Sequence, residues 1–158
     1  MTRIGLISDT HGLMRPEALS ALAGVAHIVH AGDIGSTEVL TQLRSLAPVT
    51  AVRGNNDKAA WSKTIAETEV LEIEGQQIYV LHDLSELDLD PAVAGFSVVV
   101  TGHSHKPVVT ERNGVLFVNP GSAGPRRFKL PITVGLLTIE GGRAHASILD
   151  LFETTGAA

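Results

Sequence analysis

Short apolar runs alternate with helical patterns through the first third of the chain. The runs at 4–8, 26–31 and 49–52 have the length of buried strands. Between them, apolar residues recur at helical spacing, first from Pro16 to a stop at Gly24, then from a cap at Ser36 to Pro48. This alternation predicts parallel strands joined by right-handed crossovers.

The second half of the sequence predicts antiparallel hairpins. Apolar runs flank three turn signals, Gly75-Gln76, Asn113-Gly114 and Gly141-Gly142, and a further buried strand is expected at 96–100. The acidic segment 84–95 predicts a loop with a short helix after Pro91. We therefore expect one α/β domain over residues 1–158, with a frayed tail at 153–158.

Composition narrows the classes of partner. Hydrophobic residues make up 44% of the 158 residues and charged residues 18%, which excludes a disordered chain. Lys and Arg number 12 against 17 Asp and Glu, a net charge of −5, so extended nucleic acid is not an expected partner. The chain has no cysteine, which excludes disulfides and thiolate metal sites. No apolar stretch has the length of a signal peptide or a membrane span, so we expect a cytoplasmic protein with no membrane partner.

Polar side chains that bind metals well follow almost every predicted strand. Asp9 and His11 follow the first strand and Asp33 follows the second. The remaining candidates, in chain order, are Asn55, His82, His103 and His105. Ligands gather at the carboxyl ends of strands in open α/β sheets, so these groups are expected at one edge. In an extended backbone, Asp9 with His11 and His103 with His105 would each present both side chains on one face.

This donor set favours a site with two divalent metals. Oxygen and imidazole ligands suit Mn, Fe, Ni or Zn, and seven side chains are too many for one tetrahedral ion. We expect Asp33 to bridge the two ions, because Gly32 and Gly35 allow a close approach. Each motif taken alone is also typical of a turn, a helix cap or a loop without any metal. The ordered set of four clusters, each closing an apolar strand, favours the metal site.

The ordered set resembles the calcineurin-like metallophosphoesterase superfamily, in particular its small prokaryotic single-domain phosphodiesterase branch. The resemblance extends over residues 4–152. It implies two mixed β-sheets sandwiched between helices, with a dimetal centre at the strand ends. It also implies two sets of metal ligands. One ion would be held by Asp9, His11, Asp33 and His105, and the other by Asp33, Asn55, His82 and His103.

The function expected from these residues is hydrolysis of a small phosphodiester by a metal-bound hydroxide, with Asp33, Asn55 and His103 in catalytic positions. Many family members carry a proton-donating His where this chain has Asn56, so His103 or metal-bound water is expected to assist the leaving group. Two alternatives remain open: a phosphomonoesterase or nucleotide phosphatase at the same centre, and a non-catalytic interaction scaffold, as in the small subunit of the retromer coat. A homo-oligomer is also left open.

Five other residues are interpreted more simply. His30, inside a buried strand, is expected to be a packed, hydrogen-bonded residue, and His145 is expected to be exposed. Asp83 is expected to orient the ring of His82. Arg126 and Arg127 are either a clamp for a substrate phosphate or a solvated basic pair, and the second interpretation is favoured.

Overall fold

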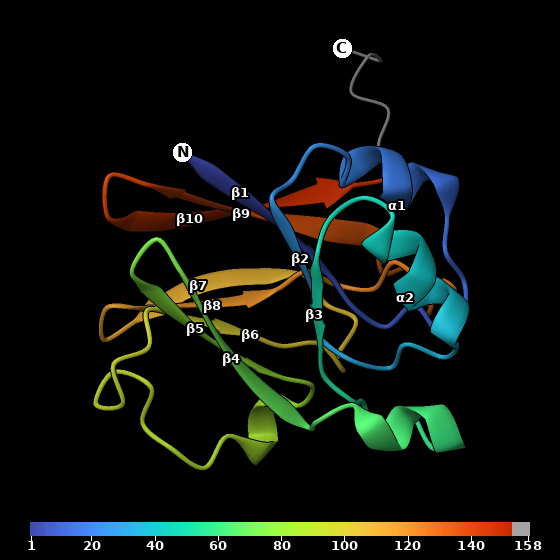
Figure 1. Cartoon of the computed structure of the whole chain (residues 1–158), viewed down its shortest axis with the longest axis horizontal. Coiled ribbons are helices and arrows are strands. Elements are labelled where there is room, and N and C mark those ends of the chain that lie inside the picture. Colours follow the sequence, from blue (N-terminus) through green and yellow to red (C-terminus); the bar gives the residue numbers. More distant parts are fainter. Residues whose placement is uncertain (153–158) are drawn as a thin grey trace.

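The computed structural model describes residues 1–152, so the tail predicted at 153–158 lies outside the described residues. Within the described part, the strands form two five-stranded mixed sheets that pack face to face (Figure 1). The first sheet has the order β10-β9-β1-β2-β3 and the second the order β4-β5-β6-β8-β7. The predicted fold of two mixed sheets is confirmed.

The first sheet contains the predicted parallel unit. Its strands are β1 (Thr2–Ile7), β2 (His27–His30), β3 (Val49–Ala51), β9 (Thr133–Glu140) and β10 (Arg143–Asp150). The strands β1, β2 and β3 are parallel, and β9 pairs antiparallel with β1. The crossovers contain α1 (Pro16–Ala21), which begins at a proline, and α2 (Thr37–Arg44), which follows Ser36.

The second sheet contains two of the predicted hairpins. Its strands are β4 (Thr68–Ile73), β5 (Gln76–Leu81), β6 (Val98–Val100), β7 (Val108–Arg112) and β8 (Val115–Asn119). The central strands β5, β6 and β8 are parallel, and β4 and β7 pair antiparallel with β5 and β8 at the edges. All three predicted hairpins are confirmed.

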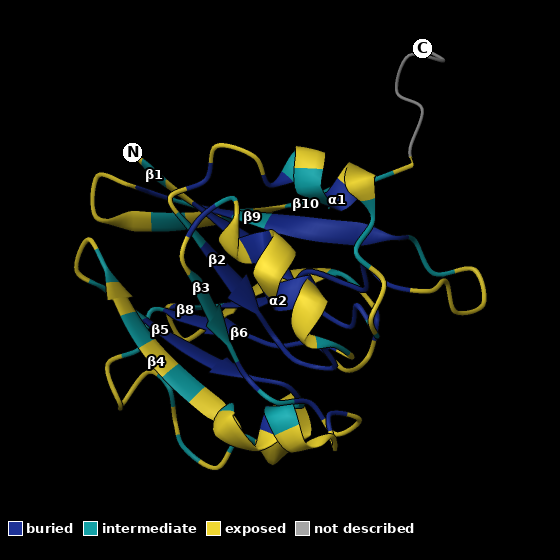
Figure 2. Ribbon diagram, turned by 45° about the vertical axis from the view of Figure 1, so that its right-hand side comes forward, coloured by how far each residue is buried: buried dark blue, intermediate teal, exposed yellow. Residues whose placement is uncertain are grey.

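Three apolar layers hold the sandwich together. Side chains such as Leu6, Val29 and Val100 fill the space between the sheets. The outer face of the first sheet packs under α1 and α2, whose opposite sides are exposed (Figure 2). Leu22 and Leu43 are fully buried there. Burial of these faces supplies the main driving force for folding.

The outer face of the second sheet is covered differently from the first. A third apolar cluster joins this face to Leu87, Leu89 and Phe96 from the connection between β5 and β6. That connection contains one short 3-10 helix, η2 (Leu84–Glu86). The helix predicted after Pro91 is wrong: residues 91–95 form a hydrogen-bonded turn, which ends at Gly95 with φ 89°. A second 3-10 helix, η1 (Ala60–Thr64), precedes β4 and was not predicted.

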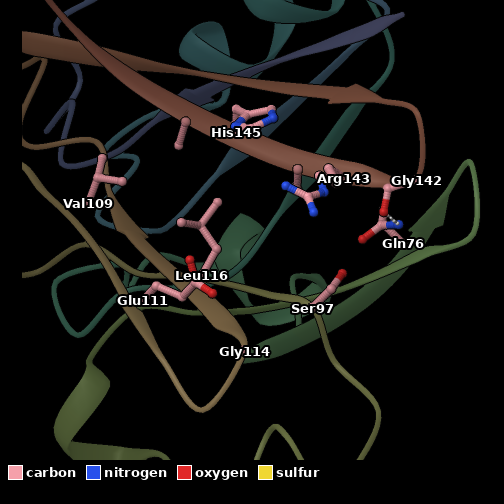
Figure 3. A pocket seen from close by; sticks show the side chains of 11 residues that line it. Gln76, Ser97, Val109, Glu111, Gly114, Leu116, Gly142, Arg143 and His145 are labelled. Carbon is pink, nitrogen blue, oxygen red and sulfur yellow. Dashed lines mark hydrogen bonds between the residues drawn. The ribbon is translucent and has the colours of Figure 1, made fainter.

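The two sheets separate at the end of the sandwich where β5, β6 and β8 begin. A cavity of about 570 Å³ opens there (Figure 3), and the small side chains of Ala144 and Ala146 help to line it. His145 lies on its rim and is exposed, as predicted. The candidate metal ligands follow the opposite ends of the strands, so this cavity is remote from them. Among the described residues, no helix combines the length and the apolar character needed to cross a membrane.

Candidate metal centre

The loops that follow five parallel strands of the two sheets meet at one edge of the sandwich. Backbone hydrogen bonds join them: Asp9 N donates to Gly32 O (2.9 Å), His11 N to Asp33 O (2.9 Å), and Gly102 N to His82 O (2.9 Å). The first two bonds join the loops after β1 and β2, and the third joins those after β5 and β6. The expected convergence at the carboxyl ends of the strands is therefore present.

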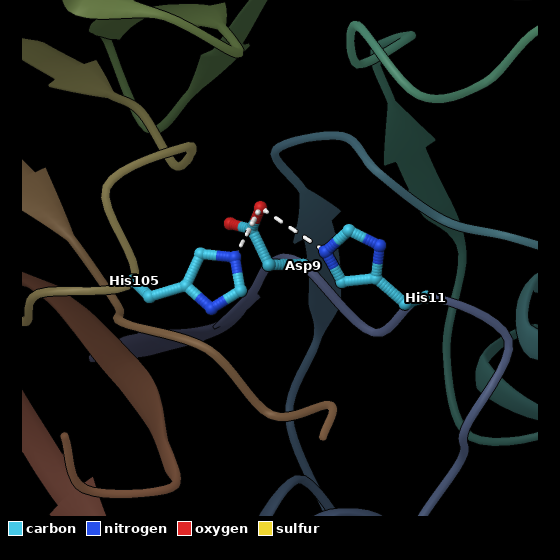
Figure 4. A group of neighbouring side chains, drawn as sticks. All are labelled: Asp9, His11 and His105. Carbon is cyan, nitrogen blue, oxygen red and sulfur yellow. Dashed lines mark ion pairs between the residues drawn. The ribbon is translucent and has the colours of Figure 1, made fainter. Parts of the chain in front are cut away.

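Asp9 lies at the middle of this edge and is fully buried. Its Oδ1 is 3.4 Å from His105 Nε2 and 3.9 Å from both His11 Nε2 and His82 Nε2. Figure 4 shows His11 and His105 on either side of the carboxylate. Its other oxygen, Oδ2, accepts hydrogen bonds from Ser8 Oγ (2.6 Å) and His103 N (3.0 Å). One oxygen thus fixes the orientation of the side chain, and the other faces three imidazoles.

Asp33 is the second buried carboxylate of the site. Its Oδ2 is 3.3 Å from His82 Nε2 and 3.8 Å from His11 Nε2. Asn56 donates to it twice, from its backbone N to Oδ1 (2.9 Å) and from its Nδ2 to Oδ2 (3.1 Å). Burial acts to raise the pKa of Asp33, but His82 and the two hydrogen bonds from Asn56 outweigh it, and the pKa lies well below its ordinary value. The side chain is held as a carboxylate.

His82 is oriented by a backbone carbonyl. Its Nδ1 lies 2.7 Å from Ala31 O, so Nδ1 carries the proton and donates it. In the neutral ring, the lone pair on Nε2 then points at Asp9 and Asp33. Burial acts to lower the pKa of His82, but these two carboxylates outweigh it and the pKa is raised. The prediction that Asp83 orients His82 is wrong, because Ala31 O occupies that position and Asp83 Oδ2 lies 3.7 Å from His103 Nε2.

Three buried atoms at this edge fit a metal ion. Asp9 Oδ1, His11 Nε2 and His82 Nε2 have no hydrogen-bond partner within residues 1–152. Buried polar atoms without a partner are costly, and carboxylate and imidazole groups that face one another are the donor set of Mn, Fe, Ni or Zn. Two groups have ligand atoms within 4.8 Å of one another: Asp9 with His11 and His105, and Asp9 with Asp33 and His82. The residues present therefore fit divalent metal ions.

Asn55 and His103 lie at the rim rather than inside these two groups. Their side chains pair with each other, His103 Nδ1 to Asn55 Oδ1 at 3.2 Å. The side chain of His103 is 45% exposed, and its ring centroid is 5.2 Å from that of His82. Five of the seven predicted ligands are thus brought together and two lie beside them. Asp9, not Asp33, is the carboxylate common to both groups, so the bridging role of Asp33 stays a prediction.

The backbone at the site is unusual. Five of the seven predicted ligands have positive φ: Asp9 (55°), His11 (47°), Asp33 (55°), His103 (70°) and His105 (63°). Non-glycine residues rarely adopt this conformation, and it is concentrated at functional sites. The expectation that each i, i+2 pair shares a face through an extended backbone is therefore wrong. Left-handed turns, which the pattern of residue types does not reveal, aim these side chains.

Close backbone packing brings the loops within reach of one another. A Cβ on Gly54 would overlap Asp33 N and Oδ1, and a Cβ on Gly102 would overlap Ser8 Oγ. Both positions are therefore restricted to glycine by the neighbouring loop.

Asp57 and Asn56 were missed as positioning residues. Asp57 is buried, and its carboxylate accepts from the backbone N of Ile34 (3.1 Å), Gly35 (3.1 Å) and Gly54 (2.9 Å). It thereby fixes the loop after β3 to the loop after β2. The sequence shows only an acid two residues after Asn55, which is ordinary turn composition.

His30 supports the site from behind without facing it. It is fully buried, its Nε2 pairs with Thr10 Oγ1 (3.0 Å), and its Nδ1 accepts from Gly32 N (3.1 Å). Burial, followed by the nearby His82, lowers its pKa to about 3, so the ring is neutral. The prediction of a packed, hydrogen-bonded histidine is confirmed.

An open cavity of about 430 Å³ gives access to the site beside His82 and Asn55. Its wall is acidic, with one arginine, Arg53, that pairs with Glu67 at 2.8 Å. The other carboxylates of the wall are Asp83, Glu86 and Asp88.

Comparison with known proteins gives consistent matches. A family model described as the calcineurin-like phosphoesterase superfamily domain matches residues 2–142, which contain all seven predicted ligands. A probable metallophosphoesterase of Methanothermobacter thermautotrophicus is 35% identical over 158 residues, covering 92% of this chain and 91% of that protein. A solved archaeal phosphodiesterase is 28% identical with a TM-score of 0.77, covering 94% and 100% of the two chains. Vps29 of Entamoeba histolytica, solved with Zn²⁺, is 25% identical with a TM-score of 0.73, covering 95% and 99%.

Proposed function

The chain belongs to the calcineurin-like phosphoesterase superfamily, and on that premise we propose that it hydrolyses a small phosphodiester at a centre of two divalent metal ions. It is a metal-dependent phosphoesterase. The observation that carries the finer proposal is the convergence of three unpartnered buried atoms, Asp9 Oδ1, His11 Nε2 and His82 Nε2, at the strand ends. The likeness to the archaeal phosphodiesterase supports a diester as the substrate.

Two sets of side chains would hold the ions. One set is Asp9, His11, Asp33 and His105, and the other is Asp33, Asn55, His82 and His103. Bound divalent ions supply positive charge for an anionic substrate and lower the pKa of water towards neutrality. Asp9 and Asp33 neutralise only two of the four positive charges, so the site is cationic although the chain has a net charge of −5. That local charge attracts a phosphodiester to an acidic protein.

His103 is the residue best placed to assist the leaving group. Hydrolysis forms one bond from a water oxygen to phosphorus and breaks one ester bond, and the departing oxygen takes up a proton. Asn56 has no acidic proton and is bonded to Asp33. His103 is half exposed at the rim and is oriented by Asn55 at 3.2 Å. Its imidazole can therefore reach both substrate and solvent.

The proposal is tested with the metal-free protein supplied with Mn²⁺. We expect bis(p-nitrophenyl) phosphate to be hydrolysed at least tenfold faster than p-nitrophenyl phosphate. Equal or faster hydrolysis of the monoester would show that the protein is a phosphomonoesterase and not a phosphodiesterase. If neither ester were hydrolysed while metal analysis showed bound ions, the alternative of a non-catalytic interaction scaffold would be favoured.

A pair of variants tests the assignment of residues. Asp33→Ala removes a buried carboxylate from the centre, so we expect turnover to be abolished and the metal content to fall. His145→Ala changes an exposed side chain at the opposite end of the sandwich, so both measurements should match the unchanged protein. Full activity in Asp33→Ala would exclude the bridging role.

A further inference from the structure

A basic and aromatic loop, residues 126–130, lies beside the candidate metal centre. Its Phe128 is 93% exposed and has a φ of 53°. Two hydrogen bonds close the loop, from Leu130 N to Arg127 O (3.0 Å) and from Arg126 Nη1 to Leu130 O (3.3 Å). A side chain directed to solvent contributes nothing to the core, and a positive φ at a non-glycine residue is of the kind that is concentrated at functional sites.

The cations around Phe128 have no acidic partners in the described part of the chain. Within residues 1–152, Lys106, Arg127 and Lys129 have no carboxylate within 4.0 Å, whereas Arg53 pairs with Glu67 at 2.8 Å. These unpaired charges stand together on a chain with a net charge of −5. They form a local anion-binding surface next to an exposed aromatic ring.

This surface continues into the candidate metal centre. A cavity of about 650 Å³ is lined by Ser104, Lys106, Arg127, Phe128, Lys129 and Leu130. Ser104 and Lys106 flank His105, one of the proposed ligands. The chain that leads into the loop also contacts the backbone of the centre, because Ser122 Oγ donates to Asp9 O at 3.0 Å. A phosphodiester held at the centre would therefore have this cavity beside it.

The other approach to the centre has the opposite charge. The cavity beside His82 is walled by Asp83, Glu86 and Asp88. An additional negative charge on the substrate would be repelled there and attracted to the side of residues 126–130. The two cavities thus give a substrate one orientation.

We propose that residues 126–130, with Lys106, bind a substituent of the phosphodiester that carries both a nucleobase and a second phosphate. This substrate class rests on the proposed function and defines it as cleavage of short nucleotides, such as a 5′-phosphorylated dinucleotide. Phe128 supplies a face on which the base stacks, and Lys106 and Lys129 bind the second phosphate. The cationic surface is limited to residues 126–130 and Lys106, so a dinucleotide fits it and a long nucleic acid would meet the acidic remainder of the protein.

The test compares three substrates with Mn²⁺-loaded protein: methyl p-nitrophenyl phosphate, the dinucleotide ApA, and its 5′-phosphorylated form pApA. We expect kcat/KM for pApA to exceed that for ApA at least tenfold. Lys129→Gln should lower this ratio at least threefold, and Phe128→Ala should raise KM for both dinucleotides at least fivefold. Hydrolysis of methyl p-nitrophenyl phosphate, which has neither a base nor a second phosphate, should fall by a smaller factor than hydrolysis of pApA in both variants.

Two matched controls change similar side chains elsewhere. Arg143→Gln removes an exposed cation at the opposite end of the sandwich, and Val93→Ala shortens a side chain that is 85% exposed. Both should keep the full preference for pApA. Calorimetric titration of the metal-free protein with pApA measures binding without turnover. Phe128→Ala should raise the dissociation constant for pApA at least fivefold.

The outcomes separate this proposal from the function on which it rests. Hydrolysis of the methyl ester without a preference for pApA overturns the role of residues 126–130 and leaves the phosphodiesterase intact. No hydrolysis of any diester by metal-loaded protein overturns the function itself. Sedimentation with anionic phospholipid vesicles that depends on Phe128, together with no preference for pApA, overturns the proposal and assigns the loop to a membrane surface.

Discussion

Individual side chains at the candidate metal centre have one atom held by a hydrogen bond and a second atom that faces the other candidate ligands. Asp9 uses Oδ2 to accept from Ser8 and His103, which leaves Oδ1 towards the imidazoles. His82 uses Nδ1 to donate to Ala31 O, which leaves Nε2 towards the carboxylates. A ligand whose second atom is hydrogen-bonded is held in one orientation and binds metal without a further loss of side-chain entropy. This division is the signature that separates these residues from ordinary buried polar groups.

His30 gives a prediction about pH. Its pKa is lowered to about 3 in the folded protein, from an ordinary value of 6.5. Between these values the unfolded chain binds a proton that the folded protein does not, so the free energy of unfolding falls as the pH falls below 6.5, by roughly 1 kcal/mol per pH unit. Above pH 6.5, His30 does not change how the free energy of unfolding depends on pH. In urea unfolding with a chelator present, His30→Gln should be less stable than the unchanged protein at pH 7.5, and the difference should shrink towards pH 5.

The comparison needs a histidine that lies outside the buried core. His145 is exposed on β10, so His145→Gln should follow the unchanged protein at every pH. Curves for His30→Gln and the unchanged protein that stay parallel from pH 7.5 to 5 would contradict the account of a buried neutral ring.

The residue types of the centre were predictable, and their bonding was not. Asp9, His11, Asp33, His82 and His105 were identified because each follows an apolar strand, and the structure brings their ligand atoms together. The positive φ at most of these positions depends on contacts between loops that are distant in the sequence. For the same reason, the partners of Asn56 and Asp57 could not be inferred from local composition.

At the scale of elements, the strands carry the fold and the loops after them carry the site. Strand periodicity and glycine-containing turns predicted the hairpins, because those signals are local. The 3-10 helices η1 (5 residues) and η2 (3 residues) were missed, since helices this short leave no periodic pattern in the sequence. The helix expected after Pro91 stops within one turn, because Gly95 adopts a left-handed conformation.

Asp57 allows a test of how the loops are held together. Its carboxylate accepts three backbone N–H groups from the loops after β2 and β3. In Asp57→Asn one acceptor oxygen is replaced by a donor, so at least one buried N–H loses its partner. We expect the free energy of unfolding to fall by about 2 kcal/mol. Metal affinity, measured by calorimetry with Mn²⁺, should also weaken, because the loop that carries Asn55 is released.

Asp90→Asn is the matched control for this variant. Asp90 is exposed and its Oδ1 accepts from Ala92 N at 3.0 Å in a surface turn. The same chemical change there should alter stability by less than about 0.5 kcal/mol and leave metal affinity unchanged. Equal effects of the two substitutions would show that Asp57 has no special role between the loops.

At the scale of the whole molecule, the candidate metal centre lies where the two sheets meet. The first sheet supplies Asp9, His11 and Asp33, and the second supplies His82 and His105. Across this junction, the buried carboxylates of Asp9 and Asp33 on the first sheet face His82 on the second sheet, and Asp9 also faces His105. An ion bound between them would link the edges of both sheets and stabilise the folded state only, since the unfolded chain does not assemble the ligands.

Metal binding is therefore expected to raise the temperature of unfolding. At a metal concentration a hundredfold above the dissociation constant, the folded state gains about 2.7 kcal/mol, which corresponds to a shift of roughly 5–10 °C for a domain of this size. Differential scanning calorimetry with Mn²⁺ should show this shift, and a chelator should reverse it. Asp9→Asn removes the carboxylate shared by both ligand groups and should abolish the shift, whereas Asp90→Asn should retain it. A shift of full size in Asp9→Asn would place the stabilising ion elsewhere and separate metal binding from the junction of the two sheets.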